Sequence, residues 1–529
     1  MSLTYVRKAS ISWVGPAVLL LLSGLLFGLS TRWGIGIRPD SIFYLGLPGM
    51  VHPNAPAYAW LLNIVAQIGA PFGLSKLGGA TVTNYVLLLS NLGLTWWIII
   101  RGTGRPWLAF LGGLLCLSAP MFLDLHVTVM SEGLFIFCIL LCLVWLARYV
   151  ETGKFGFAAA AGFAAGLATL ARFNGVPLIV LGPLSIAFLT SMPPRIRARD
   201  GAVFLLASVG MLVVWMLVQQ SSGGPGLGRE VALNGNMTAA VLNQGVSSLL
   251  SYLMPLGVVD PGLRPLLLAA CVLVWLVTLA LYLRRWSERR RTSAASAPFE
   301  SLPLVASVFV LGHVLFLVLS LFIEATLPLK PSYMLPVYVV SVITAILLVA
   351  GGAAVELSKR AQLAFVGLAL ALSALNLVRT GVLISEFRKD GIFYASPGWR
   401  NSPTVEKVAA TKPELEIYSN GADVLSFLLP GRSINWVPAK FNRRTGRDWA
   451  NNPFENRLND LRRKLAAGQA VVVILDRIEW RFYMPTERNL IEALNLVPLS
   501  READGTIYGL KEASEADLTA HKISEGNHI

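Results

Sequence analysis

The chain has 529 residues, of which 55% are hydrophobic and only 14% charged, and its mean hydropathy is +0.62. Soluble domains carry about 25% charged residues, so this composition excludes a soluble protein and indicates a polytopic membrane protein. The formal net charge of +14 does not indicate a nucleic-acid partner, because Arg and Lys gather in the loops between apolar segments, as they do in cytoplasmic loops.

Apolar segments of roughly twenty residues follow one another along the first 385 residues, and each can cross a hydrocarbon core. Arg7 and Lys8 precede the first segment, which favours a cytoplasmic N-terminus. Residues 57–74 are less apolar, and we expect them to form a helix in the membrane interface. About eleven spans are predicted, at residues 11–30, 81–100, 107–120, 130–146, 155–171, 175–190, 202–218, 265–283, 302–322, 333–350 and 361–378.

Basic residues occur in every loop that this alternation assigns to the cytoplasm, with the densest cluster at residues 284–291. The pattern predicts that loops 31–80 and 220–263 lie on the outer side of a plasma or inner membrane. Residues 1–385 would then form the transmembrane domain.

From about residue 386 the composition becomes that of a soluble domain, in which strand patterns alternate with helical ones. We predict strands at residues 414–419, 470–475 and 505–510, with helices after Asp423 and at residues 455–467 and 486–494. Residues 386–529 are therefore expected to form an extracytoplasmic α/β domain. Its basic cluster, made of Lys440, Arg443, Arg444 and Arg447, is interpreted as a solvated face in preference to a contact with anionic headgroups.

Ionisable side chains gather at the predicted outer ends of the spans. Such groups are costly near a bilayer and are functional candidates by default, and no phosphate-binding loop or zinc-protease motif occurs elsewhere. On one membrane face they could line a single cavity. They are Asp40 and His52 in the first outer loop, Asp124, His126 and Glu132 around the second, Arg172 after the fifth span, and Glu324 and Lys330 before the tenth.

This combination of carboxylates and cations suits sugar transfer from a polyprenyl-phosphate donor. A carboxylate takes the proton of the attacking hydroxyl, which accelerates such reactions on the order of 10²- to 10⁴-fold. The leaving phosphate is a stable anion and needs only cations or a metal to neutralise it. A single catalytic Asp fits this reaction better than the two facing carboxylates of a glycoside hydrolase.

Several short motifs occur in a distinctive order: residues 38–41 with Tyr44, His52-Pro53, Ser131-Glu132, residues 166–175 and residues 333–338. This order resembles the GT-C superfamily of integral membrane glycosyltransferases, which includes protein O-mannosyltransferases and lipid A aminoarabinose transferases. The resemblance implies a GT-C-like fold over residues 10–340 with Asp40 as the catalytic base. It also implies substrate contacts by Lys330 and Arg172, with His52 near the lipid carrier and Tyr44 and Glu132 as further contacts.

Many GT-C members carry an acidic pair in the first outer loop, whereas Asp40 stands between Pro39 and Ser41. A divalent cation is therefore left open, with Asp124 and Glu132 as its candidate ligands. Simpler interpretations also remain. Glu132 could only cap its helix, Asp124 and His126 could be exposed loop residues, and Arg172 could extend to the interface without touching substrate.

The favoured function is an inverting glycosyltransferase that uses a polyprenyl-phosphate-linked sugar and a lipid, glycan or protein acceptor. A polytopic transporter or flippase of a lipid-linked or small substrate is the alternative, although no internal repeat is visible. A sensor or assembly protein whose outer domain binds a partner is a third class, in which Asp40 would be dispensable.

Overall fold

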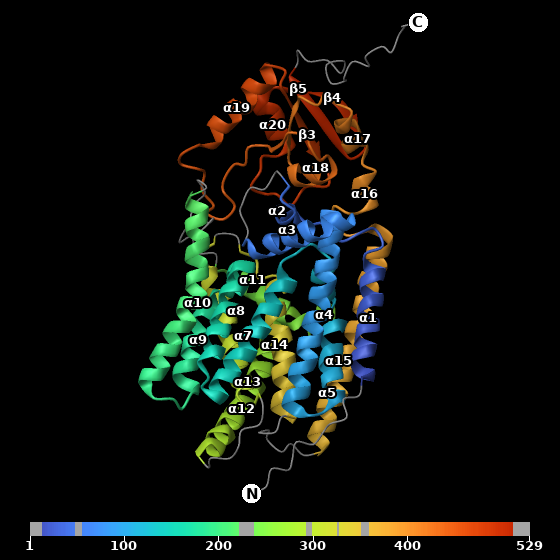
Figure 1. Ribbon diagram of the computed structural model, residues 1–529. Helices are drawn as coiled ribbons and strands as arrows, with labels where there is room; N and C mark the ends of the chain where they lie inside the picture. Colours follow the sequence, from blue (N-terminus) through green and yellow to red (C-terminus); the bar gives the residue numbers. More distant parts are fainter. Residues whose placement is uncertain are drawn as a thin grey trace.

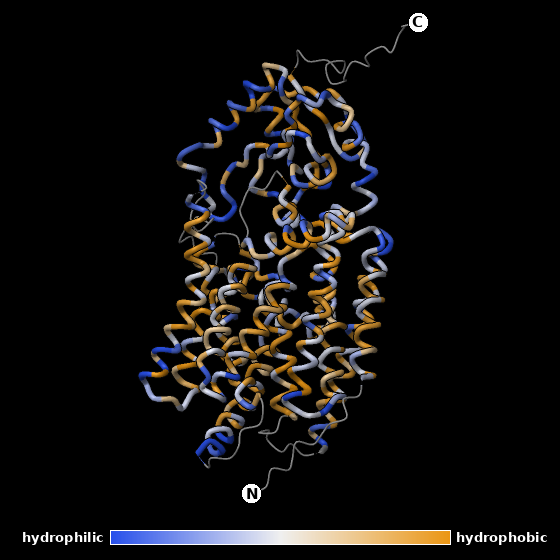
Figure 2. The backbone as a smooth tube through the Cα atoms, viewed as in Figure 1, coloured by the Kyte–Doolittle hydropathy of each residue, from blue (hydrophilic) through white to orange (hydrophobic). Residues whose placement is uncertain are grey.

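The computed structural model describes residues 13–47, 55–221, 237–291, 299–324, 327–350 and 359–510. A bundle of apolar helices carries a smaller domain at one end (Figure 1). Hydrophobic residues dominate along the bundle, and hydrophilic residues are frequent in the small domain (Figure 2). This division agrees with a membrane-embedded part followed by a water-exposed one.

Within the part of the chain that the structure describes, seven helices are long and apolar enough to span a membrane, or eight if the bent pair α5–α6 counts as one span. A multi-pass membrane protein is thereby confirmed, whereas the count of eleven stays a prediction, because α1, α8 and α9 are shorter. The bundle helices are α1 (Val14–Ser30), α4 (Lys76–Thr103), α5 (Pro106–Ser118), α6 (Pro120–His126), α7 (Glu132–Thr152), α8 (Phe155–Ala171), α9 (Val176–Leu189), α10 (Pro194–Ser221), α12 (Arg264–Arg291), α13 (Leu302–Ser320), α14 (Pro331–Ala350) and α15 (Lys359–Asp390).

The bend between α5 and α6 measures 71° and corrects one expectation. Pro120 cannot continue the hydrogen bonding of α5 but is well suited to the first turn of α6. The chain therefore turns within the bundle, and Asp124 and His126 are buried instead of lying in an exposed loop.

Short helices lie between the bundle and the small domain. They are α2 (Pro39–Tyr44), α3 (Ala57–Gly69) and α11 (Ala239–Leu250). Helix α3 runs across the ends of the bundle helices, in the orientation expected for an interfacial helix (Figure 1). Helix α2 begins at Pro39, and the Arg38 N–H donates to Ser41 Oγ at 2.8 Å to cap it.

The small domain is built on a five-stranded sheet of order β2-β1-β3-β5-β4. Its strands are β1 (Glu416–Ser419), β2 (Ile434–Trp436), β3 (Ala470–Leu475), β4 (Leu496–Glu502) and β5 (Gly505–Leu510), and its helices are α16 (Pro397–Arg400), α17 (Pro403–Ala409), α18 (Ala422–Leu428), α19 (Phe454–Ala466) and α20 (Glu487–Leu494). β1 pairs in parallel with β2 and β3, while β5 runs antiparallel to β3 and β4.

The central strand β3 is buried throughout, as its continuous apolar pattern predicts. Three predicted strands and three predicted helices of this domain are found, but β2 and β4 were not predicted. β2 has only three residues, and β4 carries Pro498 and a register shift between Pro498 and Ser500, which obscures the alternation expected of a strand.

The segment before α2 is bonded to both parts of the molecule. The Gly36 N–H donates to Val127 O at 2.8 Å in the bundle, and the Tyr394 N–H donates to Ile37 O at 3.0 Å from the start of the small domain. A Cβ at position 36 would collide with Thr128 and Ile392, so glycine permits this close approach. The first outer segment is therefore fixed between bundle and small domain.

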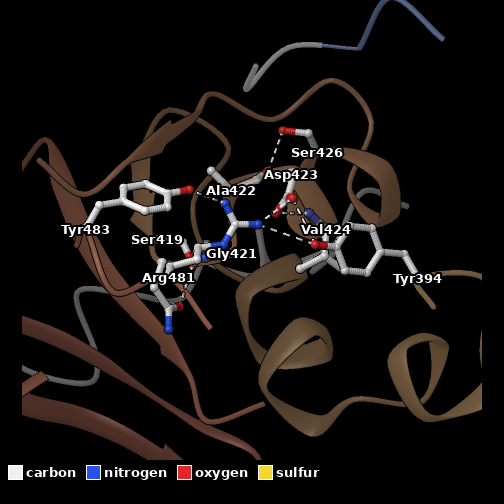
Figure 3. A network of polar contacts seen from close by, with 10 residues as sticks. Tyr394, Ser419, Gly421, Ala422, Asp423, Val424, Ser426, Arg481 and Tyr483 are labelled. Atoms are coloured by element: carbon white, nitrogen blue, oxygen red, sulfur yellow. Dashed lines mark hydrogen bonds and ion pairs between the residues drawn. The ribbon is translucent and has the colours of Figure 1, made fainter. Parts of the chain in front are cut away.

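A buried network of polar contacts joins Arg481, Asp423 and Tyr394 in the small domain (Figure 3). Arg481 Nη2 lies 2.6 Å from Asp423 Oδ2, and the Tyr394 hydroxyl donates to the same oxygen at 2.8 Å. Asp423 lies in the first turn of α18, the helix that contacts α2. The side chains of Arg481 and Asp423 are 6% and 1% exposed, so each charge is compensated mainly by the other.

Candidate active site

A cavity of about 230 Å³ lies where α2, the turn after α8, the connection between α13 and α14 and the small domain meet. Apolar side chains, including Phe316, Ile323 and Leu327, form part of its wall. Its polar lining comes from widely separated parts of the sequence and consists of Asp40, Tyr44, Arg172, Asn174, Ser320, Glu324, Tyr333, Arg443 and Arg444. The sequence-predicted residues Asp40, Tyr44 and Arg172 are thus brought together.

Asp40 lines this cavity from the first turn of α2, where the helix dipole favours a carboxylate. Its side chain is exposed, and within the described ranges of the chain it makes no hydrogen bond or ion pair. Ser41 fixes the helix beneath it, because its hydroxyl donates to Val129 O at 2.8 Å. Asp40 therefore presents an unengaged carboxylate from a rigid support.

Arg172 ends α8 in an extended conformation and turns the chain into the 3-10 helix Phe173–Gly175. Its Nη1 lies 2.7 Å from Oε1 of Glu132, the first residue of α7. The two side chains are 16% and 2% exposed, so the ion pair is largely desolvated. Glu132 does lie at a helix start, but it also holds Arg172 at the cavity wall.

Tyr44 and Ser131 extend this polar chain. The Tyr44 hydroxyl lies 2.9 Å from Ser131 Oγ, and Arg172 Nη1 donates to the same oxygen at 3.4 Å. Burial raises the pKa of Tyr44, so the side chain stays a neutral phenol at physiological pH. The Tyr333 ring faces the Arg172 guanidinium with 5.7 Å between guanidinium carbon and ring centroid, close enough for a cation–π contact.

Asp124 and His126 are buried and do not line the cavity. Both carboxylate oxygens of Asp124 lie 2.7 Å from Arg38 Nη2, and the Arg38 guanidinium also stacks on Phe393 with 5.2 Å to the ring centroid. His126 Nε2 lies 3.0 Å from Asn91 Nδ2. These contacts give Asp124 the task of holding Arg38, the residue that precedes α2.

The proposed metal ligands do not fit a cation site. Asp124 and Glu132 are each paired with an arginine. Among the residues with described positions, no group of three or more His, Cys, Asp or Glu side chains is arranged to hold a metal ion. The chemistry of this site is therefore derived from its side chains alone.

Lys330 precedes α14 and does not line the cavity, although it interacts electrostatically with Asp40 and Arg443. Partial burial lowers the pKa of its amine, and the charge of Arg443 lowers it further. The segments on either side of Lys330 are fixed, because Ser248 Oγ donates to Leu329 O at 2.6 Å and the Tyr252 hydroxyl donates to Pro331 O at 2.7 Å. His52, the other predicted carrier contact, lies outside the described residues.

The sequence assigned Arg443 and Arg444 to a solvated face; Arg443 is exposed and Arg444 half-buried, and both also line the cavity, which was not predicted. They belong to the loop between β2 and α19 and reach the cavity from the small domain. In the sequence, the only feature that distinguishes this loop is its high density of basic residues. Its separation from Asp40 by some four hundred residues left no sequence signal for the contact.

The arrangement of these elements defines a class of membrane fold, the GT-C fold predicted from the motif order. No known protein-family profile and no curated protein matches the sequence.

One solved protein, in two states, shares the fold. ArnT from Cupriavidus metallidurans bound to undecaprenyl phosphate matches with a TM-score of 0.58 at 14% identity, over 94% of this chain and 98% of that chain. The apo state of the same protein matches with a TM-score of 0.57 at 15% identity, over 95% of this chain and 98% of that chain. The archaeal oligosaccharyltransferase AglB from Archaeoglobus fulgidus has a TM-score of 0.47 at 13% identity, over 90% of this chain and 70% of that chain. The likeness to ArnT spans both the bundle and the small domain and confirms the GT-C-like fold.

Proposed function

We propose that this protein is an inverting membrane glycosyltransferase that moves a sugar from a polyprenyl-phosphate-linked donor to a lipid, glycan or protein acceptor. The observation that carries this proposal is the unengaged Asp40 carboxylate in a cavity lined by arginines and apolar side chains. The shared fold with ArnT, which was solved with undecaprenyl phosphate, supports a lipid-phosphate donor.

In the proposed reaction, the acceptor hydroxyl attacks the anomeric carbon of the donor sugar while Asp40 accepts the hydroxyl proton. The bond between that carbon and the phosphate oxygen breaks, and its electron pair leaves with the polyprenyl phosphate. A single displacement of this kind inverts the anomeric configuration. Asp40 suits the role of base because no arginine or lysine is bonded to it in the described structure.

The leaving phosphate gains negative charge during this step, and preorganised cations stabilise it. Arg172 is such a cation, because the Glu132 ion pair and the Tyr333 ring fix its guanidinium before substrate arrives. Lys330 supplies a second positive charge nearby. The apolar wall at Phe316, Ile323 and Leu327 would accept the first isoprene units of the lipid.

The basic loops favour an orientation with the N-terminus in the cytoplasm and the cavity on the outer side of a bacterial-type inner membrane. Residues 1–385 would then be the transmembrane transferase domain, and residues 386–529 would be extracytoplasmic. A transporter or flippase is not favoured by the likeness to ArnT.

The proposal is tested with purified full-length protein in detergent, a panel of polyprenyl-phosphate hexoses and pentoses with labelled sugars, and a cell-envelope extract as acceptor. We expect labelled sugar in the product together with an equal amount of free polyprenyl phosphate for at least one donor, and none from nucleotide sugars. Absence of transfer from every lipid-linked donor, with transport of a lipid-linked substrate in vesicles, would favour the transporter instead.

A further inference from the structure

The loop of residues 440–447, called here the arginine loop, connects β2 with α19. It descends from the small domain toward the ends of the bundle helices (Figure 1), and its lowest part is hydrophilic (Figure 2). Arg443 and Arg444 in this loop line the cavity that holds Asp40. The C-terminal domain thus contributes side chains to a site otherwise built from the bundle and its connecting segments.

The arginine loop has a defined conformation. The Asn442 N–H donates to Arg447 O at 2.9 Å, and the Gly446 N–H donates back to Asn442 O at 2.8 Å. The Asn442 side chain is buried and accepts the Arg444 N–H at 3.0 Å, while Gly446 adopts a φ of +66° that closes the turn. This bonding sets the backbone of Arg443 and Arg444 before any ligand binds.

Lys330 stands near the arginine loop on a segment that Ser248 and Tyr252 hold in place. Its amine is close enough to Arg443 for the two positive charges to repel, which is one reason that the pKa of Lys330 is lowered. Arg443 and Arg444 share the cavity lining with Arg172, and Lys330, which lies outside that lining, adds a positive charge near Arg443. Such a concentration of positive charge favours an anionic ligand. The geometry is that of an anion site shared by two domains.

The rest of the cavity restricts the kind of anion. Phe316, Ile323 and Leu327 give it an apolar wall, and α13, which carries Phe316, is one of the candidate membrane spans. A ligand that matches both the basic lining and the apolar wall of the cavity has an anionic head and an apolar tail. A phosphate can accept several hydrogen bonds from guanidinium groups at once, which arginines favour.

We propose that Arg443 and Arg444 close over the phosphate of a lipid-linked donor, so that the C-terminal domain forms part of the donor site. This inference rests on the proposed function and deepens it, because it assigns the domain a direct role in donor binding. Lys330 holds the same phosphate from the bundle side, and the apolar tail lies toward α13.

The test measures the affinity of the full-length protein in detergent for undecaprenyl phosphate and for undecaprenol, which lacks the phosphate. The variant carries Arg443→Gln and Arg444→Gln together. The matched control is Arg447→Gln, an exposed arginine of the same loop that does not line the cavity. A double Arg→Lys variant at positions 443 and 444 retains the charge and checks that the loop still folds.

We expect the double Gln variant to bind undecaprenyl phosphate about tenfold or more weakly, as loss of charged hydrogen bonds implies. Affinity for undecaprenol and the control variant should be unchanged, and the Lys variant should recover part of the loss. If the wild type prefers undecaprenyl phosphate to undecaprenol but the Gln substitutions have no effect, the assignment of the arginines alone is overturned. No wild-type preference for undecaprenyl phosphate over undecaprenol would overturn this assignment and the lipid-phosphate donor together.

Discussion

At the scale of single residues, the carboxylates of the site differ in whether each is paired with an arginine. This difference distinguishes the carboxylate that acts on substrate from those that shape the site. Asp124 and Glu132 are buried and each is compensated by an arginine. Asp40 is exposed to the cavity without such a partner in the described structure. Asp124 and Glu132 are poor candidates for the base, because each carboxylate is buried, already bound to a guanidinium and absent from the cavity lining. Of the two carboxylates that line the cavity, Asp40 and Glu324, Asp40 is the one carried by the anchored helix α2, and we take it as the residue for proton transfer.

The lowered pKa of Lys330 gives donor binding a pH dependence. Burial and the charge of Arg443, with a further contribution from Arg38, make the amine lose its proton at a lower pH than the ordinary 10.5, although Asp40 opposes this shift. Because only protonated lysine attracts phosphate, affinity for undecaprenyl phosphate should fall as pH rises from about 7 to 10.

Lys330→Arg should remove most of this pH dependence, since a guanidinium stays charged throughout that range. Titration of the dissociation constant for both proteins checks the expectation. Identical pH profiles for wild type and variant would rule out titration of Lys330 as the cause.

At the scale of elements, α2 carries Asp40 and is held by contacts on two sides. Arg38 joins the bundle through Asp124 and the small domain through Phe393, while Ser41 bonds the backbone of Val129. The helix has only six residues and would be unstable alone. Its position, and with it the direction of the Asp40 carboxylate, depends on these anchors.

Arg38→Met tests this dependence, because it keeps the length of the side chain but leaves the Asp124 charge buried without its partner. Breaking such a pair costs about 3 kcal/mol, so thermal unfolding in detergent should shift to lower temperature. The sugar-transfer rate should fall as well, because α2 loses its anchor.

In the double variant Arg38→Met/Asp124→Asn, stability should recover in part and the rate should stay low. A double variant with both wild-type stability and wild-type rate would show that the Arg38–Asp124 pair does not position α2.

At the scale of the whole molecule, the sequence predicts the parts better than their contacts. Local hydrophobicity can be read from short stretches of sequence, and it determines the positions of the spans, the interfacial helix α3 and the buried strand β3. The turn at Pro120 is marked by a single proline, whereas the pairs Arg38–Asp124 and Arg172–Glu132 depend on packing between segments 86 and 40 residues apart. A single sequence carries no signal for such pairs. The approach of Arg443 and Arg444 to the cavity is the most distant contact of this kind.

The small domain contacts α2 through α18, and the network of Arg481, Asp423 and Tyr394 joins α18 to the segment that bonds to Ile37. Bundle, connecting segments and small domain each supply part of the cavity lining. The fold shared with ArnT extends over this whole arrangement and not over the bundle alone. The proposed chemistry is accordingly a property of the full chain.

The central claim is that Asp40 acts as the base in sugar transfer from a lipid-phosphate donor. The most direct measurement compares wild type and Asp40→Asn for both donor binding and the rate of sugar transfer in the same preparations, with Asp260→Asn as an exposed carboxylate control outside the cavity. Asp40→Asn is expected to bind the donor as wild type does, while its rate falls on the order of 10²- to 10⁴-fold. Transfer by Asp40→Asn at the wild-type rate would contradict this claim.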